Sequence, residues 1–317
     1  MTYTPQGIDS RPAVWMISAS LCFATMVGFT HALGPRCDWL TIALVRVSVM
    51  FVSSVTIAWL GGAALVFSTP RTLWMRSFAG SFSLVCSFYA STRLPVGDFI
   101  TLSNTYPIWI VMLAWLSGKK AATPGDGLRI ACALTGVVLI GGPNLSGDNF
   151  GAAVALLGSV STAVAMIGLH RLREVDPRAV VAHFSGVATV IAGSWFLIRG
   201  PGAGEVVGGT IGSGSPGQDP LTWLLLIGVA ASGTVGQLLL TRAYAAGAPA
   251  RVSMLGLSQV VFGLGFDVLL WQRSISPAAL VGMVLVVAPN AWLLAHPGVV
   301  PVEDEGSLVA ISSVQEV

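Results

Sequence analysis

The sequence predicts an all-α integral membrane protein with ten transmembrane helices, arranged as two inverted five-helix repeats around a central cavity. Three observations lead to this fold class: the composition, the length of the apolar segments and the distribution of the basic residues. Apolar residues make up 54% of the chain, charged residues only 9%, and the mean hydropathy is +0.79. A soluble domain carries about 25% charged residues, so this chain has too few charges to cover a water-exposed surface.

Ten segments are long and apolar enough to cross a bilayer as helices, which requires about 20 residues each. The predicted spans are 13–33, 39–60, 73–92, 97–116, 127–142, 150–170, 179–198, 221–244, 252–271 and 278–295. The fifth is short and rich in glycine. The apolar part of the first is too long for a signal peptide, and no small-residue cleavage motif follows it, so we expect it to be retained as a span.

The basic residues fix the predicted orientation. With a cytoplasmic N-terminus, the cytoplasmic set is Arg11, Arg71, Arg76, Lys119, Lys120, Arg129, Arg171, Arg173, Arg178, Arg242 and Arg251. The external set is Arg36, Arg93, Arg199 and Arg273. This imbalance follows the positive-inside rule along the whole chain. Both termini are therefore expected in the cytoplasm, and the expected location is the plasma (inner) membrane.

The predicted spans divide the chain into two repeats with flanking segments. Residues 1–12 form a cytoplasmic N-terminal segment, 13–143 the first five-helix repeat and 150–295 the second, inverted repeat. Within the second repeat, 200–219 is rich in glycine and serine and is typical of a flexible external loop. Residues 296–317 include an acidic run and are expected to form a disordered cytoplasmic tail.

An internal similarity supports the two repeats. "YASTRLP" at 89–95 precedes the fourth span, and "AYAAGAP" at 243–249 precedes the ninth. Aligning their final prolines gives an offset of 249 − 95 = 154 residues. Because each half has an odd number of spans, the second half enters the membrane from the opposite side. This inverted arrangement is typical of many transporter folds.

Polar residues follow one face of the fourth and of the ninth span at the 100° advance of a helix. The fourth-span stripe consists of Asp98, Thr101, Thr105, Trp109 and Met112, flanked by Asn104 and Tyr106. The ninth-span stripe consists of Ser253, Gly256, Val260, Gly263 and Asp267, flanked by Gln259. Lipid penalises such groups, so these faces should contact protein or a watery cavity. They either line a substrate path or join helices by hydrogen bonds.

These stripes, with polar and aromatic residues of other spans, give the candidate site. The residues predicted to line the cavity are Phe23, Tyr89, Thr101, Asn104, Thr105, Trp109, Gln237, Gln259 and Gly263. Pro107 is expected to kink the fourth span. Arg46, inside the second span, is expected to form a gate or ion pair with Asp98 or Asp267. His183 is interpreted either as a packing residue or as a proton-coupling group.

Several function classes are not supported by the residues. The net charge of +2 gives no sign of nucleic-acid binding, and no soluble-enzyme motif is found. The four cysteines have neither paired nor metal-type spacing, so we expect no disulfide, metal or other cofactor. The expected partners are a small-molecule substrate and membrane lipid.

The chain resembles EamA-like carriers of the drug/metabolite transporter superfamily over 13–295. The resemblance rests on "FYASTRLPVGDFITLSNTYPIWIVMLAWLSGKK" at 88–120, on "DGLRIACALTGVVLIGG" at 126–142, on Arg46, and on "LLLTRAYAAGAPARVSMLGLSQVVFGLGF" at 238–266. Two positions depart from the family pattern: Val261 replaces a second mid-helix proline, and Gly118–Lys119–Lys120 stands where a glutamate is usual. The resemblance implies ten helices, a cavity near spans one, three, four, six, eight and nine, alternating access, and export of small metabolites, amino acids or drugs.

The expected function is therefore a secondary transporter, and not an enzyme. The few charges on the cavity faces suit a small neutral or zwitterionic solute, such as an amino acid or an aromatic metabolite, better than a phosphate. Proton coupling through Asp98 or Asp267 and facilitated diffusion are both compatible with the sequence, as are a monomer and a homodimer. The alternative is a membrane-embedded scaffold or an enzyme without transport activity.

Overall fold

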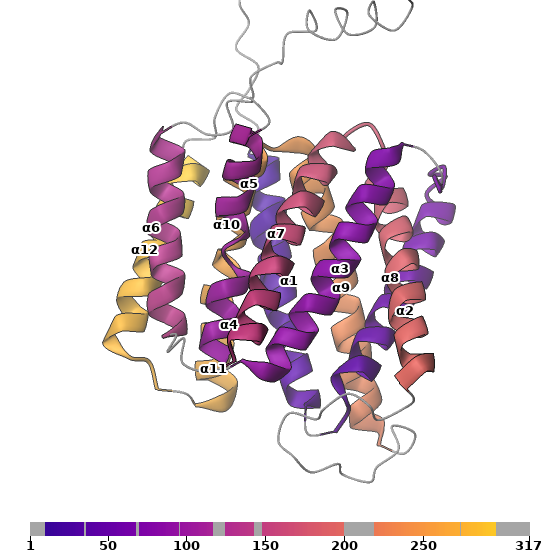
Figure 1. Ribbon diagram of the computed structural model, residues 1–317, viewed down its shortest axis with the longest axis horizontal. Helices are drawn as coiled ribbons and strands as arrows, with labels where there is room; N and C mark the ends of the chain where they lie inside the picture. The colour runs from indigo at the N-terminus through magenta and orange to yellow at the C-terminus, as the bar shows by residue number, and fades with distance from the viewer. Residues whose placement is uncertain are drawn as a thin grey trace, which may run out of the picture.

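A computed structural model describes residues 10–34, 36–67, 70–94, 96–116, 124–142, 148–199, 219–272 and 274–295. All regular elements within these ranges are α-helices, and they form one bundle (Figure 1). The helices are α1 (Arg11–Leu33), α2 (Trp39–Leu60), α3 (Arg71–Arg93), α4 (Val96–Ser103), α5 (Tyr106–Leu116), α6 (Pro124–Gly141), α7 (Asn149–Arg171), α8 (Pro177–Arg199), α9 (Pro220–Ala246), α10 (Pro249–Gly256), α11 (Ser258–Trp271) and α12 (Pro277–Ala295). The predicted flexible loop lies outside the described residues except for Asp219, and the predicted tail at 296–317 lies outside them entirely.

Nine helical segments in the described ranges are long and apolar enough to cross a membrane. Two of these segments are pairs of shorter helices, α4 with α5 and α10 with α11. Helix α3 has the length of a span, 23 residues, but its three arginines and its serines lower its hydropathy, and it is not among the nine. The all-α class and the membrane-crossing helices agree with the sequence prediction, whereas the tenth span depends on α3.

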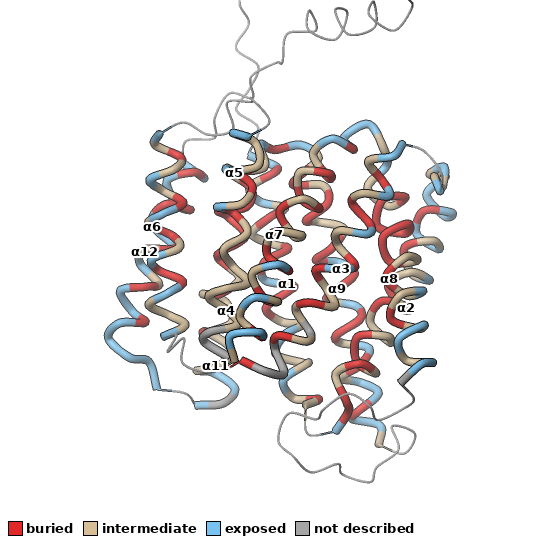
Figure 2. Tube along the Cα trace, viewed as in Figure 1, coloured by how far each residue is buried: buried red, intermediate tan, exposed pale blue. Residues whose placement is uncertain are grey.

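The two ends of the bundle are named here by the helix termini that lie at each of them. We call the end at which α1 begins and α12 ends the terminal end, and the opposite end the distal end; they lie at the top and bottom of Figure 1. Buried residues gather where helices face one another, and exposed apolar residues cover the outer faces (Figure 2). An apolar outer surface is what a lipid environment requires.

The helix contacts repeat between the two halves of the chain. Helix α1 packs along α9 as α7 packs along α3, and α2 contacts α9 as α8 contacts α3. Two further pairs, α2 with α8 and α6 with α12, join corresponding helices of the two halves. Each half therefore packs mainly on the other, so neither half forms an independent bundle.

Aspartates begin three of the helices at the distal end. The side chains of Asp38, Asp148 and Asp219 accept hydrogen bonds from first-turn backbone N–H groups of α2, α7 and α9. These bonds satisfy donors that a helix start leaves unpaired. The Leu221 N–H bond, with smaller contributions from Thr222 and Arg36, lowers the pKa of Asp219 below its ordinary value. Arg36 also pairs with Asp219, which ties the α1–α2 connection to the start of α9.

Helices α6 and α12 cross at two glycines. A Cβ atom added to Gly136 would lie 2.5 Å from the Gly282 carbonyl oxygen, and one added to Gly282 would lie 2.6 Å from the Gly136 oxygen. The backbones are therefore in direct contact, as small residues permit in membrane helices. Nearby, Pro289 has no N–H to offer Leu285, and the Cys132 thiol donates to the Leu285 carbonyl instead, at 3.8 Å.

Candidate functional site

The fourth and ninth spans are both interrupted near the middle of the bundle. Helices α4 and α5 are separated by a turn at 104–105. Pro107 explains this break, because its ring collides with the preceding turn and it has no N–H for the Ser103 carbonyl. The sequence predicts a bend at the proline, and the structure has a full interruption just before it. The Thr105 hydroxyl donates to the Leu102 carbonyl at 2.7 Å, which compensates part of the lost bonding.

The interruption of the ninth span was missed by the sequence prediction, because no proline marks it. Helices α10 and α11 meet at Leu257, where the backbone N–H of Leu257 bonds to Met254 and that of Val260 to Leu257. These tighter bonds leave the carbonyls of Ser253 and Gly256 without their usual α-helical donors. The Ser258 hydroxyl donates to Leu255 at 2.6 Å, as Thr105 does at the other break.

The two freed carbonyls accept hydrogen bonds from side chains in the first half of the chain. The Tyr106 hydroxyl, at the start of α5, donates to the Ser253 carbonyl at 3.1 Å. The Ser20 hydroxyl, on α1, donates to the Gly256 carbonyl at 3.3 Å. The broken helix of the second half is thus joined to α5 and α1 through the two carbonyls that the break deprives of their helical donors.

Gly256 makes this contact possible, and its replacement is a test. A Cβ atom at Gly256 would overlap the Tyr106 hydroxyl and lie 2.7 Å from the Met16 Cε atom. We expect Gly256→Ala to destabilise the protein by about 1–3 kcal/mol through overpacking, measured as a lower midpoint of thermal unfolding. Gly265→Ala on α11 is the control, because an added Cβ there meets no atom within 4 Å. Equal midpoints for the two variants would contradict the close Tyr106 contact.

Three charged residues join helices near the terminal end. The Asp126 side chain, 8% exposed at the start of α6, lies 3.1 Å from Arg129 Nη1 and 3.5 Å from Arg251 Nε on α10. Arg129 also stacks on the Trp292 ring of α12, with its Cζ atom 3.4 Å from the ring centroid. This network holds α6, α10 and α12 together. In the sequence these arginines count only as basic residues of the cytoplasmic side, because only the fold brings the three helices to one point.

The predicted fourth-span stripe contacts α7. Thr105 Oγ1 lies 2.8 Å from Ser159 Oγ, and the Trp109 indole N–H donates to Thr105 Oγ1 at 3.3 Å. The Asn104 amide donates to the Ile100 carbonyl of its own helix at 2.8 Å. These three predicted cavity residues therefore have protein partners, and the Thr105–Ser159 contact is the one of these bonds that joins the fourth span to another helix.

Other predicted cavity residues have unused polar atoms. Thr101 Oγ1 on α4 and Gln237 Nε2 on α9 are buried without a hydrogen-bond partner in the described part of the chain. Phe23 packs on α9 beside Gln237, since a Cβ atom at Gly236 would lie 3.1 Å from its ring. Gln259 is half-buried on α11, and a side chain at Gly263 would meet no atom within 4 Å. Unpaired buried polar groups are costly, which makes Thr101 and Gln237 candidates for ligand contact.

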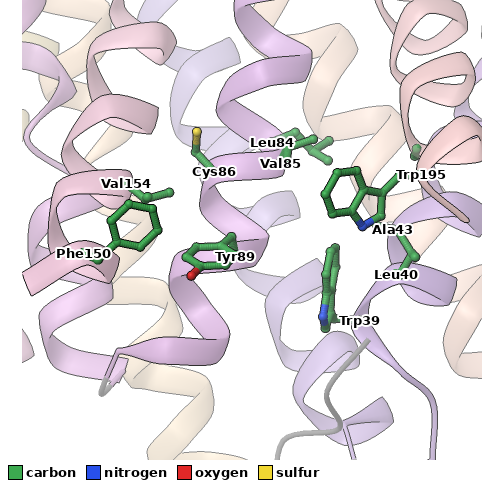
Figure 3. Close-up of a pocket in the computed structure, with 11 residues that line it drawn as sticks. Trp39, Leu40, Ala43, Leu84, Val85, Cys86, Tyr89, Phe150, Val154 and Trp195 are labelled. Atoms are coloured by element: carbon green, nitrogen blue, oxygen red, sulfur yellow. The ribbon is translucent and has the colours of Figure 1, made fainter. Parts of the chain in front are cut away.

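Tyr89 lies apart from these residues, in an apolar pocket of about 250 Å³. The pocket is lined from α2, α3, α7 and α8 (Figure 3). Its aromatic residues are Trp39, Tyr89, Phe150 and Trp195, and the Tyr89 and Phe150 rings pack edge to face at 6.0 Å. None of its lining residues comes from α4, α9 or α11, so Tyr89 and Gln237 line different spaces. The sequence could not predict this pocket, because apolar residues that line a pocket look the same in a sequence as apolar residues packed between two helices.

Of the predicted gate residues, Arg46 and Asp267 are described, and the side chain of Asp98 is not. Arg46 packs on Gly233 of α9, and its Nε atom is buried without a hydrogen-bond partner among the described residues. No ion pair joins Arg46 to Asp267, which is half-buried on α11. The Asp98 side chain lies outside the described residues, so its pairing with Arg46 stays a prediction. No group of three metal-ligating side chains occurs in the residues that the structure describes.

His183 has a structural environment. Its Nε2 faces the Phe67 carbonyl at 3.2 Å and must donate to it, which leaves Nδ1 to accept from the Ser77 hydroxyl at 2.7 Å. The Trp74 ring packs edge to face on the imidazole, with centroids 4.6 Å apart. Both ring nitrogens are therefore used in joining α8 to α3 and to the α2–α3 connection, which favours the packing interpretation over proton coupling.

Comparisons with known proteins agree with this architecture. A protein of known crystal structure has the same fold, with a TM-score of 0.72 and 18% sequence identity. The match covers 90% of this chain and 96% of that one. An uncharacterised transporter of Helicobacter pylori strain J99 is 26% identical over 72% of this chain and 74% of its own length. The pseudopaline exporter CntI of Pseudomonas aeruginosa is 25% identical over 71% and 75%, and human solute carrier family 35 member G1 is 22% identical over 69% and 60%.

The sequence profile of the EamA-like transporter family matches the chain in two segments, residues 10–142 and 149–293. The two matches fall on the two halves whose helix contacts repeat, and together they cover most of the chain. The relatives are membrane transporters, and the apolar helices are those of a multi-pass membrane protein. The chain therefore belongs to the EamA-like transporter family.

Proposed function

We propose that the protein is a secondary transporter that exports a small neutral or zwitterionic metabolite, an amino acid or a related aromatic compound, across the inner membrane by alternating access. The observation that carries this proposal is the pair of interrupted helices, which lie at corresponding places of the two halves. Many transporters with inverted repeats bind their solutes near the bilayer midplane, at the discontinuities of such broken helices.

The conformation supports alternating access because its two ends differ. At the terminal end α5 packs on α10, through the Tyr106 bond to Ser253, and Asp126 links α6 to Arg251 of α10. At the distal end α4 packs on α6 and α7, whereas α11 packs mainly on α1, with smaller contacts to α12 and α6. We infer that the path is closed at the terminal end and open at the distal end. Transport then requires these terminal contacts to break while α4 and α11 approach.

The reciprocal helix contacts favour the predicted inverted repeat. A twofold axis in the membrane plane would exchange α1 with α7, α3 with α9, α4 with α10 and α5 with α11. The observed pairs α1–α9 and α7–α3 are exchanged by this operation. With α3 as a tenth span, the terminal end carries most of the basic residues, so we assign both termini to the cytoplasm and the distal end to the outside.

The candidate solute follows from two buried polar atoms without a partner among the described residues, on Thr101 and Gln237, and from two further predicted cavity residues. Thr101 and Gln237 offer a hydroxyl and an amide, Gln259 a second amide, and Phe23 an aromatic ring. We propose that these groups bind the solute, and that Thr105, Asn104 and Trp109 support the wall behind them. Arg46, Asp98 and Asp267 remain the proposed gate. Transport is either coupled to protons through the two aspartates or is facilitated diffusion.

Flux measurements on Thr101→Val and Gln237→Leu test the proposal. Both substitutions remove a buried, unpaired polar atom, so the protein should be as thermally stable as the wild type or more so. If the groups bind solute, uptake of a labelled amino-acid mixture into proteoliposomes should fall by about tenfold for each variant. Thr135→Val is the control, because that exposed hydroxyl bonds only to Ala131 of its own helix.

The same experiment separates the carrier from a scaffold or an enzyme. A scaffold has no use for buried polar atoms without partners, and its variants would be more stable with no flux to lose. Solute movement that is equal in the wild type, in Thr101→Val and in Gln237→Leu would remove these residues from the path. No movement of any amino acid or aromatic metabolite by the wild type would contradict the proposed substrate class.

A further inference from the structure

Arg76 is a fully buried arginine that the proposed transport path does not use. The sequence places it within the predicted span 73–92 and among the basic residues of the cytoplasmic side; in the structure it lies in the second turn of α3 and is 1% exposed. Two of its guanidinium nitrogens, Nε and Nη1, are buried without a hydrogen-bond partner among the described residues. Arginines are almost never buried in this way without a partner.

The packing around Arg76 leaves room for the guanidinium but offers no anion. Its Cζ atom lies 4.3 Å from the centre of the Phe184 ring on α8. A Cβ atom at Gly80 would overlap Arg76 Nη1, and one at Gly168 of α7 would lie 3.2 Å from Arg76 Cβ. The two glycines therefore keep space for the arginine between α3, α7 and α8. No ion pair to Arg76 occurs in the part of the chain that the structure describes.

This arrangement does not make Arg76 a stabilising residue. The cost of burying an unpaired guanidinium exceeds what one contact with an aromatic face returns, and an apolar side chain of similar length would pack there at lower cost. Ionisable groups at membrane depth mark functional sites. Because the Arg76 charge destabilises this conformation, we look for its role in a different conformation of the carrier.

We propose that Arg76 binds a small anion, either the carboxylate of the transported solute or a free inorganic anion such as chloride, when the carrier is open at the terminal end. This inference rests on the proposed alternating access. Arg76 lies near the terminal end, and α7, which encloses it on one side, also contacts α5 and α10. Opening between α5 and α10 would therefore free α7 on that side and bring water and solute to Arg76. The planar guanidinium fork suits a carboxylate, which matches a zwitterionic solute and adds the one cation that the Thr101 and Gln237 groups lack.

A binding measurement tests the assignment directly. The full-length protein in detergent is unfolded thermally, with intrinsic tryptophan fluorescence as the signal, in sodium gluconate and in sodium chloride at equal ionic strength. A second pair of samples in gluconate contains a mixture of amino acids or of the corresponding amino-acid amides. We expect chloride or the amino acids, and not the amides, to raise the midpoint by about 2 °C or more. A chloride response identifies the inorganic anion, and an amino-acid response identifies the solute carboxylate.

Arg76→Met should abolish that response while unfolding at or above the wild-type temperature in gluconate. Arg76→Lys keeps the charge and should retain part of the anion-induced rise in the midpoint. This variant also tests the assignment if Arg76→Met does not fold. Arg173→Met is the control, because the Arg173 side chain is 58% exposed and pairs with Glu174. The same anion response in the wild type and in both Arg76 variants would overturn the assignment, as would no response in the wild type.

Proteoliposome flux keeps this inference separate from the proposed function. With the assignment correct, Arg76→Met should reduce amino-acid flux by about tenfold, the loss expected for one charge-assisted hydrogen bond. An anion response that depends on Arg76 in a wild-type protein that moves no solute would leave the anion site standing and reject the transporter. Undiminished flux in Arg76→Met would reject the anion site and leave the transporter standing.

Discussion

Gly136→Ala is expected to lower the midpoint of thermal unfolding by about 5 °C or more, the largest stability effect among the substitutions considered for this protein. The added methyl group would lie 2.5 Å from the Gly282 carbonyl oxygen and 2.8 Å from Val286 Cγ2. A backbone oxygen cannot rotate away as a side chain can, so α6 and α12 must separate. Thermal unfolding of the purified protein in detergent, followed by tryptophan fluorescence, measures the loss.

Gly127→Ala is the matched control for this substitution. Gly127 is also on α6, but a Cβ atom there meets nothing within 4 Å. Alanine is the better helix former by about 1 kcal/mol, so Gly127→Ala should be neutral or slightly stabilising. Equal midpoints for the two alanine variants would show that the helices do not cross at Gly136.

Asp126→Asn is expected to shift the protein toward conformations that are open at the terminal end. The substitution removes the charge that holds Arg251 of α10 and Arg129 of α6. Because both arginine side chains are partly exposed, 33% and 25%, we expect a loss of about 1–2 kcal/mol, or roughly tenfold in the open population.

A single reporter cysteine measures this shift. Ser253, which is fully buried behind the Tyr106 contact, is replaced by cysteine in a chain whose four native cysteines are removed. A hydrophilic thiol reagent should label it about tenfold faster when Asp126 is asparagine. Glu174→Gln is the control, because that side chain is 89% exposed. A lower unfolding midpoint without faster labelling would mean that Asp126 serves packing alone.

Most of the helix positions could be read from the sequence because lipid leaves a chain few choices. An apolar run of about 20 residues must form a helix to satisfy its backbone. The break before Pro107 was also within reach, since proline cannot continue the preceding turn. The break at Leu257 was not, because its tighter hydrogen bonds are stabilised by Tyr106 and Ser20 from distant parts of the chain.

The candidate site was predicted only in part, for a similar reason. A helical stripe tells which residues share a face, but it does not tell what lies opposite that face. The stripe that contains Thr105 and Trp109 meets Ser159 of α7. Among the predicted cavity residues, Thr101 and Gln237 have buried polar atoms without a partner in the described part of the chain. Tyr89 was grouped with them by its polarity, although it faces a separate apolar pocket.

The sequence by itself determined that this chain crosses a membrane repeatedly, that its two halves are related and that it resembles EamA-like carriers, because composition and segment length are local properties. Only the tertiary structure decided which charges are paired. Asp126 and Arg251 meet although 125 residues separate them, whereas Arg76, which the sequence counts only among the cytoplasmic basic residues, is enclosed by α3, α7 and α8 with no anion among the described residues. Burial and pairing depend on which helices become neighbours, and no local pattern records that.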